Sequence, residues 1–284
     1  MKYRLGKLSR MSAGLMFVVL SLFCCDCLAQ IPASMKYGEN VSYDAYFKWG
    51  LVLSRAGEAV ISCSADDYSV KDAVTCYQML FKTTKFFDNF FKMRDTLVCH
   101  FDSSNRLLYS KKASDEGDYY SIDEVTFKHS EKSVNQSDSK SAEIHSLRYT
   151  PKRVRIDTVL RVEGDVADFL GAMYFLRRID RNRLSSGATY PLTIAIGRAL
   201  IKMKFCYQNQ AIVEHGGRKF NTRYFTLDIY DDTFASPTAS AEVWVGDDDN
   251  FIPVKIRSKL RIGYAEIYFK SSSNLAHPLD CEVK

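Results

Sequence analysis

Hydrophobic and polar residues alternate with a period of two along most of this chain. Residues 41–47, 201–207 and 223–230 each place their apolar side chains on one face of an extended segment. Such alternation is typical of β-strands that bury one face and expose the other. The clearest pair of segments is 241–245 and 252–262, which flank a short acidic turn. The pattern predicts a mostly β protein with a large antiparallel sheet.

One segment, residues 165–178, departs from this alternation and predicts a helix. Asp165 suits the N-cap, and Asp168 places a second carboxylate beside the free N–H groups of the first turn. The apolar residues of the segment recur mostly at spacings of three and four, which buries a wide face; they are Val166, Phe169, Leu170, Met173, Phe175 and Leu176. We expect one central helix that packs in the core of the β structure, with Phe169 buried.

The first 29 residues have the parts of a secretory signal peptide. Four basic residues precede the apolar run 15–23, and Cys27-Leu28-Ala29 ends the segment with a small-x-Ala motif. The apolar run is shorter than the roughly 20 residues that span a bilayer. A lipoprotein signal would need a small residue just before its cysteine, and none of the cysteines here has one. We predict cleavage after Ala29.

The remaining residues, 30–284, are predicted to form a single β-rich domain with no transmembrane span. Within it, a polar low-complexity run over about 129–142 predicts a flexible loop. The formal net charge of the whole chain is +5, and removal of the signal peptide, with its four basic residues and one acid, lowers it to +2. The basic character therefore comes largely from the signal peptide, and it does not indicate nucleic acid as a partner.

Five cysteines lie beyond the signal peptide, at positions 63, 76, 99, 206 and 281. None forms a CxxC motif, so the sequence indicates neither a structural zinc site nor a thioredoxin-like centre. An exported chain can form disulfides. If residues 56–62 and 74–84 form a hairpin with a symmetric register, Cys63 and Cys76 lie opposite each other, at a separation that a disulfide spans. We predict a disulfide between them.

The last hairpin carries a row of cations. Lys255, Arg257, Lys259 and Arg261 alternate with apolar or small residues, so the four side chains share one face, about 6.6 Å apart along the strand. Such a row suits anionic lipid headgroups or acidic glycans, although a solvated outer face that discourages edge pairing has the same pattern. With the aromatic Trp49, these four residues are the candidate ligand-binding residues.

The sequence carries few signals of catalysis. It contains no Gly-rich phosphate loop, no G-x-S-x-G motif and no H-E-x-x-H motif. The acidic turn 247–250 lacks the glycine and the distal glutamate of an EF-hand calcium loop, so a solvated turn is the favoured interpretation. We therefore name no catalytic or metal-ligating residues and expect no cofactor.

The order of several short motifs points to a family. They are Gly38-Glu39, Tyr43, Trp49, Ala56-Gly57, Met93-Arg94-Asp95, Met173-Tyr174-Phe175-Leu176-Arg177, Gly187, Val243-Trp244-Val245, Ile252-Pro253-Val254 and Ile262-Gly263. Over nearly the whole mature chain this series resembles the exported bacterial family known as domain of unknown function 3108. The resemblance implies a large antiparallel sheet curved towards a barrel, in the bacterial envelope, and it transfers no catalytic residues. Gln30 after the cleavage site is typical of a Bacteroides-type source.

Together these observations favour a non-enzymatic protein of the periplasm or the outer-membrane periphery of a Gram-negative bacterium. We expect it to bind an amphipathic glycan or lipid, or another envelope protein. The abundant aromatic residues fit either a well-filled β core or a cavity for an apolar or sugar ligand. The alternative function is a hydrolase of envelope polysaccharide, whose pair of acids the sequence does not identify.

Overall fold

Strands dominate the fold. The computed structural model describes residues 31–67, 69–130, 140–230, 238–260 and 263–283. The strands are β1 (Glu39–Trp49), β2 (Val52–Ala65), β3 (Ala73–Thr83), β4 (Met93–Asp102), β5 (Leu107–Glu116), β6 (Tyr119–His129), β7 (Ser141–Thr150), β8 (Arg153–Glu163), β9 (Val166–Ala167), β10 (Thr189–Ile196), β11 (Ala199–His215), β12 (Arg218–Tyr230), β13 (Thr238–Gly246), β14 (Pro253–Lys259), β15 (Tyr264–Ser273) and β16 (Glu282–Val283). The helices are α2 (Lys85–Asp88), α3 (Phe169–Leu176) and the 3-10 turn η1 (Arg181–Arg183).

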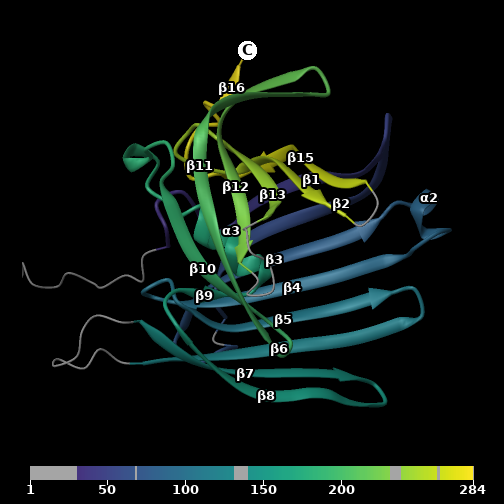
Figure 1. Cartoon of the computed structure of the whole chain (residues 1–284), viewed down its shortest axis with the longest axis vertical. Helices are drawn as coiled ribbons and strands as arrows, with labels where there is room; N and C mark the ends of the chain where they lie inside the picture. The colour runs from purple at the N-terminus through teal and green to yellow at the C-terminus, as the bar shows by residue number, and fades with distance from the viewer. Residues whose placement is uncertain (1–30, 68, 131–139, 231–237, 261–262, 284) are drawn as a thin grey trace, which may run out of the picture.

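The described strands form one sheet in the order β8-β7-β6-β5-β4-β3-β2-β1-β15-β14-β13-β12-β11-β10-β9, with β16 paired to β12. Neighbours pair antiparallel throughout, except for the short parallel pair of β9 and β10. The sheet curves until its two ends approach each other (Figure 1), and Arg198, in the turn between β10 and β11, donates a hydrogen bond to the carbonyl of Arg155 on β8. The predicted fold class, a curved antiparallel sheet that tends to a barrel, is confirmed.

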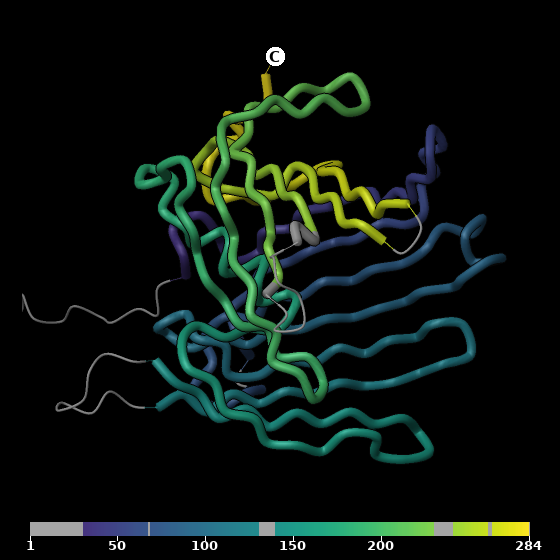
Figure 2. Tube along the Cα trace, viewed as in Figure 1, coloured from purple at the N-terminus to yellow at the C-terminus, as the bar shows by residue number. Residues whose placement is uncertain are grey.

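Helix α3 lies inside the curved sheet, between β3 and β4 on one side and β9 and β10 on the other (Figures 1 and 2). The ring of Tyr174, on this helix, stacks on the ring of Phe101 at a centroid distance of 3.8 Å and meets the ring of Tyr77 edge-on at 5.4 Å. Leu170, Tyr174 and Leu176 are completely buried. The helix is therefore the core element that the sequence predicted.

The helix nevertheless begins later than the sequence suggested. Asp168, rather than Asp165, is the N-cap, and its carboxylate accepts a hydrogen bond from the Gly171 N–H. Residues 166–167 form β9 instead of a first helical turn, because they pair with β10. The expected burial of Phe169 is wrong: its side chain is 65% exposed at the first position of the helix, whereas Leu170, Gly171 and Ala172, which follow it, are buried.

Arg177, the C-cap residue of α3, forms a buried ion pair with Glu39 at the start of β1. Both side chains are 1% exposed. The guanidinium also donates to the carbonyls of Ser34 and Asn250. Burial alone would lower the pKa of Arg177, but the bonds to Glu39 outweigh burial and the pKa is raised. This pair joins the N-terminal segment, the helix and the turn after β13.

Three other predictions concern the signal peptide, the polar loop and membrane-spanning segments. The expected signal peptide, 1–29, lies outside the described residues, as do residues 131–139 of the expected loop. His129 ends β6 and Ser141 begins β7, and the flexible loop expected between them stays a prediction. In the described part of the chain, no helix has the length and apolar character to cross a membrane.

The predicted disulfide has no basis in the observed register. Cys63 lies opposite Tyr77, and Cys76 lies opposite Ser64. Because side chains alternate between faces, this one-residue offset turns the two thiols to opposite sides of the sheet. Both cysteines are free thiols. The symmetric register that we predicted is therefore wrong.

Candidate functional site

The outer face of β12–β15 carries polar and aromatic side chains that lie in register across four strands. The first cross-strand row contains Tyr224, Trp244, Lys255 and Tyr268, the second contains Thr226, Glu242, Arg257 and Glu266, and the third contains Lys259 and Tyr264. The inner face of the same strands is apolar, with Phe225 and Val243 buried. Alternation within each strand therefore places a charged, aromatic surface on the side of the sheet away from α3.

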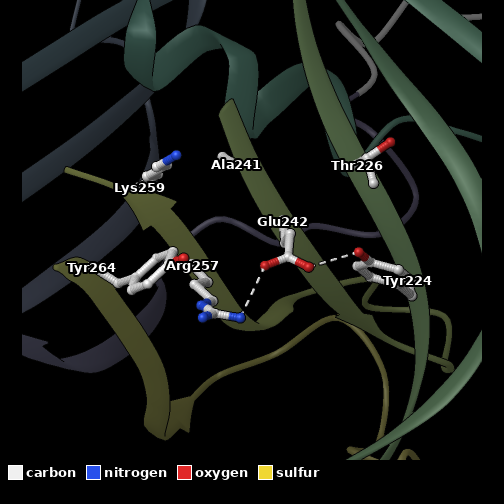
Figure 3. A pocket seen from close by; sticks show the side chains of 7 residues that line it. All are labelled: Tyr224, Thr226, Ala241, Glu242, Arg257, Lys259 and Tyr264. Carbon is white, nitrogen blue, oxygen red and sulfur yellow. Dashed lines mark hydrogen bonds and ion pairs between the residues drawn. The ribbon is translucent and has the colours of Figure 1, made fainter. Parts of the chain in front are cut away.

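A pocket of about 180 Å³ lies on this face (Figure 3). It is lined by Tyr224, Thr226, Ala241, Glu242, Arg257, Lys259 and Tyr264. We call it the outer-face pocket. Its lining combines a carboxylate, two cations and two phenol rings, so it can accept and donate hydrogen bonds and also offer the flat face of a ring.

Arg257 connects the charged groups of the pocket. Its Nη1 lies 3.4 Å from Glu242 Oε2, and its Nε lies 3.5 Å from Glu266 Oε1. The guanidinium also lies 4.0 Å from the ring centroid of Tyr264. These contacts hold the guanidinium over the Tyr264 ring as a fixed, planar group.

Glu242 also accepts a hydrogen bond of 2.8 Å from the hydroxyl of Tyr224 (Figure 3). Burial and the bond to Glu242 raise the pKa of Tyr224 to about 12. The phenol therefore stays protonated at neutral pH. One wall of the pocket is thus a fixed chain of Tyr224, Glu242 and Arg257.

Glu266 is buried beneath the pocket, with only 2% of its side chain exposed. Burial by itself raises its pKa, but the hydrogen bond from Tyr268 and the charges of Lys255, Lys48 and Arg257 outweigh burial and hold the pKa of Glu266 below its ordinary value. The carboxylate is therefore ionised at neutral pH and anchors the surrounding cations.

Lys255 lies beside the pocket over two rings. Its Nζ is 4.7 Å from the ring centroid of Trp244 and 5.3 Å from that of Tyr268. Burial lowers the pKa of Lys255. Among the described residues, no carboxylate forms an ion pair with Lys255 or Lys259. Four cations (Lys48, Lys255, Arg257 and Lys259) thus face two carboxylates (Glu242 and Glu266), which leaves the surface positive.

The structure brings together part of the predicted ligand-binding set. Lys255, Arg257 and Lys259 share one face of β14, as the alternation predicted. Arg261 lies outside the described residues. Trp49 is 65% exposed at the end of β1 and does not line the pocket. The row is therefore a set of cations held among aromatic rings and carboxylates rather than a bare basic stripe.

Sequence reasoning missed Tyr224, Glu242 and Tyr264, which line the pocket, and Glu266, which is buried beneath it. Within its own strand, each of these residues is next to an apolar residue of the opposite face and therefore lies on the outer face. Only the pairing of the four strands β12 to β15 brings them beside Arg257. A signal was available in β15, where the acid Glu266 occupies a position between apolar neighbours.

The turn 247–250 differs from the solvated turn that the sequence favoured. Asp248 and Asn250 are buried. Asp248 accepts from the backbone N–H groups of Asn250 and Cys281, and the Asn250 amide donates to the carbonyls of His277 and Pro278. The turn therefore anchors the C-terminal segment. Across the described ranges, no group of three or more His, Cys, Asp or Glu side chains has an arrangement that could hold a metal ion.

The model of a protein family of unknown function, DUF3108, matches residues 42–270. The chain belongs to the DUF3108 family. The matched region runs from β1 to β15 and contains α3 and the whole lining of the outer-face pocket.

The fold of this DUF3108 protein is similar to that of a solved structure, a β-barrel-like protein of the domain of unknown function DUF1849 from Brucella abortus. The two share 11% sequence identity with a TM-score of 0.53, over 83% of this chain and 96% of the other. At this identity the similarity concerns the fold alone. No curated protein matches the chain in sequence.

Proposed function

We propose that this DUF3108 protein is a non-enzymatic binding protein of the bacterial envelope, and that its outer-face pocket holds the acidic sugar headgroup of an amphipathic glycan. The observation that carries this proposal is the arrangement of Arg257 over the Tyr264 ring, with Lys255 and Lys259 beside it and without ion-pair partners among the described residues. An aromatic face suits the apolar side of a sugar ring, and the cations suit its carboxylate or phosphate.

The barrel-like fold is compatible with a binding role, because its strands hold the pocket side chains in a fixed register. The proposed localisation in the bacterial envelope rests on the signal-peptide pattern of residues 1–29. It is tested by N-terminal sequencing of the protein from the periplasmic fraction, where we expect Gln30 as the first residue.

The alternative function is hydrolysis of an envelope polysaccharide. Glu242 and Glu266 flank Arg257 on alternate strands and are the carboxylates nearest to the pocket. A glycosidase requires one carboxyl group that stays protonated as a general acid, with a raised pKa. The pKa of Glu266 is shifted in the opposite direction, which favours binding over hydrolysis as the proposal.

The test uses a chain that begins at Ile31 and measures binding of oligogalacturonate by calorimetry, with a neutral malto-oligosaccharide of the same length as the control ligand. We expect the acidic sugar to bind and the neutral sugar to bind at least tenfold more weakly. Arg257→Gln should weaken binding of the acidic sugar by about 10- to 150-fold, because a charge-assisted bond contributes about 1.5–3 kcal/mol.

The matched control variant is Arg55→Gln. Arg55 also bridges two carboxylates, Asp44 and Glu58, but it lies outside the pocket. Equal affinity for the two sugars, or an equal loss in both arginine variants, would overturn the proposal. Release of reducing ends that Glu266→Gln abolishes would establish the hydrolase instead.

A further inference from the structure

Most of the large apolar side chains that the described residues expose lie at one end of the barrel. They include Leu51, which is fully exposed, Phe90 at 73%, Trp49 at 65% and Phe86 at 63%. These residues belong to the turn between β1 and β2 and to the segment around α2, between β3 and β4 (Figure 1). Tyr119, after the turn from β5, and Leu260, after β14, extend the set. We call these six residues the apolar rim.

The topology explains why the rim residues gather. Successive antiparallel strands place every second turn at the same end of a sheet. The turns after β1, β3, β5, β7 and β14 therefore share the end of the barrel opposite the turns after β2 and β4 (Figures 1 and 2). A folded protein normally carries few exposed apolar side chains that are gathered in one place, and such a gathering marks an interaction site.

The side chains of the rim come from several different turns. Phe86 packs against Phe90 edge-on at 5.4 Å, but Trp49, Leu51 and Tyr119 lie on other turns. A protein partner needs a continuous, complementary surface of standard size. Isolated aromatic and leucine side chains at the tips of loops instead suit the lipid–water interface, where each side chain inserts independently.

The charges near the rim favour an anionic bilayer. The exposed cations Lys85, Lys152, Arg153 and Lys259 form no ion pair among the described residues. The acids of the same turns are mostly paired: Asp88 with Arg94 and Asp115 with Lys92, which leaves Asp118 as an exposed acid without an ion pair in this part of the structure. Cations next to a membrane surface that contains anionic lipid each contribute to binding.

From these observations we infer that the apolar rim docks this protein reversibly on a lipid bilayer that contains anionic headgroups. Tyr264 and Lys259 of the outer-face pocket pair in register with each other, and Tyr264 pairs with Lys48, one residue before Trp49. Docking would therefore bring the pocket close to the headgroup layer. The docking itself does not require that the pocket bind a glycan.

The experiment is a vesicle-sedimentation assay with the chain that begins at Ile31, which contains the whole described fold and omits the apolar run 15–23. The vesicles consist of phosphatidylethanolamine with phosphatidylglycerol, or of phosphatidylcholine alone. We expect binding to be stronger for the anionic vesicles. The double variant Leu51→Ser, Phe90→Ser should bind at least about tenfold more weakly, because two inserted side chains are lost.

The matched control is the double variant Phe169→Ser, Ile212→Ser. It also removes one phenylalanine and one branched aliphatic side chain, which are 65% and 58% exposed but lie away from the rim. Binding of this control should equal that of the wild type. The chain contains two tryptophans, so a Trp244→Phe background makes Trp49 the single reporter, and brominated lipid should quench its fluorescence.

Failure of the wild type to bind either vesicle, or an equal loss in both double variants, would overturn the inference. A concentration-dependent dimer that the rim variant abolishes, without vesicle binding, would assign the rim to a second copy and also overturn it. Tyr264→Ala separates this result from the proposed function. It should abolish binding of the acidic sugar and leave vesicle binding unchanged.

Discussion

The two ends of the barrel are built from the same strands but differ in what covers their inner face. Strand β1 shows the difference within eleven residues. At its start, Glu39, Val41 and Tyr43 are buried against the α3 end, whereas at its finish Trp49 is 65% exposed. Alternation alone assigns the face of each residue, but only the covering element determines burial. The end that α3 covers therefore holds the buried contacts that stabilise the fold, and large apolar side chains at the other end stay exposed.

The largest effect should come from the ion pair at the α3 end. Glu39→Leu leaves the Arg177 guanidinium buried without its carboxylate, which costs about 3–5 kcal/mol of unfolding free energy. Denaturant unfolding measures this cost. The control is Glu58→Leu, which breaks surface ion pairs with Arg55 and Lys82 that contribute about 0–1 kcal/mol.

A second change tests whether the pair itself is required. In the double variant Glu39→Leu, Arg177→Leu, no buried charge remains, so much of the lost stability should return. If Glu39→Leu costs no more than Glu58→Leu, the α3 end is not the stabilising end, and the comparison between the two ends fails.

The next largest difference in stability should appear when one leucine at each end is replaced by alanine. Leu176→Ala removes a completely buried side chain of α3, which should cost about 2–5 kcal/mol. Leu51→Ala removes a fully exposed side chain and should change stability by no more than about 0.5 kcal/mol. Chemical denaturation of both variants is the measurement, and similar costs for the two would contradict the assignment of the ends.

The difference between the ends also shows how far the sequence predicts this protein. Period-two alternation identified most of the strands, because it assigns residues to the two faces of a strand whatever its neighbours are. The helix was predicted from its apolar spacing, but its first turn was not. Residues 166–167 pair with β10, and a contact so distant in sequence leaves no local signal in Asp165 or Asp168.

The candidate site was predictable only within a single strand. The spacing of Lys255, Arg257 and Lys259 places their side chains on the same face of the strand. Their partners come from β13 and β15, and no pattern within β14 indicates that Glu242 and Glu266 lie opposite Arg257. The abundant aromatic residues suggested a filled core or a cavity, but Phe86, Phe90 and Phe91 are exposed, because they belong to the segment around α2 at the end of the barrel that carries the apolar rim.

The α3 end and the outer-face pocket should also differ, by a smaller amount, in how they make the stability of the protein depend on pH. Burial raises the pKa of Asp168 at the α3 end above its ordinary value of 3.8, although the Cys99 thiol and the Gly171 N–H bond to the carboxylate. A raised folded-state pKa means that stability is lost as pH rises from about 4 through that pKa. Asp168→Asn keeps the N-cap, so it should become progressively more stable than the wild type over this range.

The opposite dependence holds for Glu266 beneath the outer-face pocket. Its lowered pKa means that its contribution is complete above the ordinary value of 4.5 and is lost as pH falls below it. Glu266→Gln should therefore lose stability relative to the wild type at neutral pH and approach it in acid. Thermal unfolding between pH 3 and 8 measures both variants, with Asp165→Asn as the exposed control. Parallel pH curves for the two variants would contradict the opposite shifts.

The smallest effect concerns the cysteines of β2 and β3, where the observed register excludes the disulfide that a symmetric hairpin would allow. Cys63 faces the core and Cys76 faces the other side of the sheet, so reducing agent should leave the unfolding midpoint of the chain that begins at Ile31 unchanged. A disulfide here would stabilise by about 3 kcal/mol.

Burial raises the pKa of the Cys63 thiol to about 12, so iodoacetamide should label it in denaturant but not in the folded protein. Without reductant, all five thiols should be labelled in denaturant, and recovery of a peptide pair that joins Cys63 to Cys76 would show that the strands adopt the symmetric register after all.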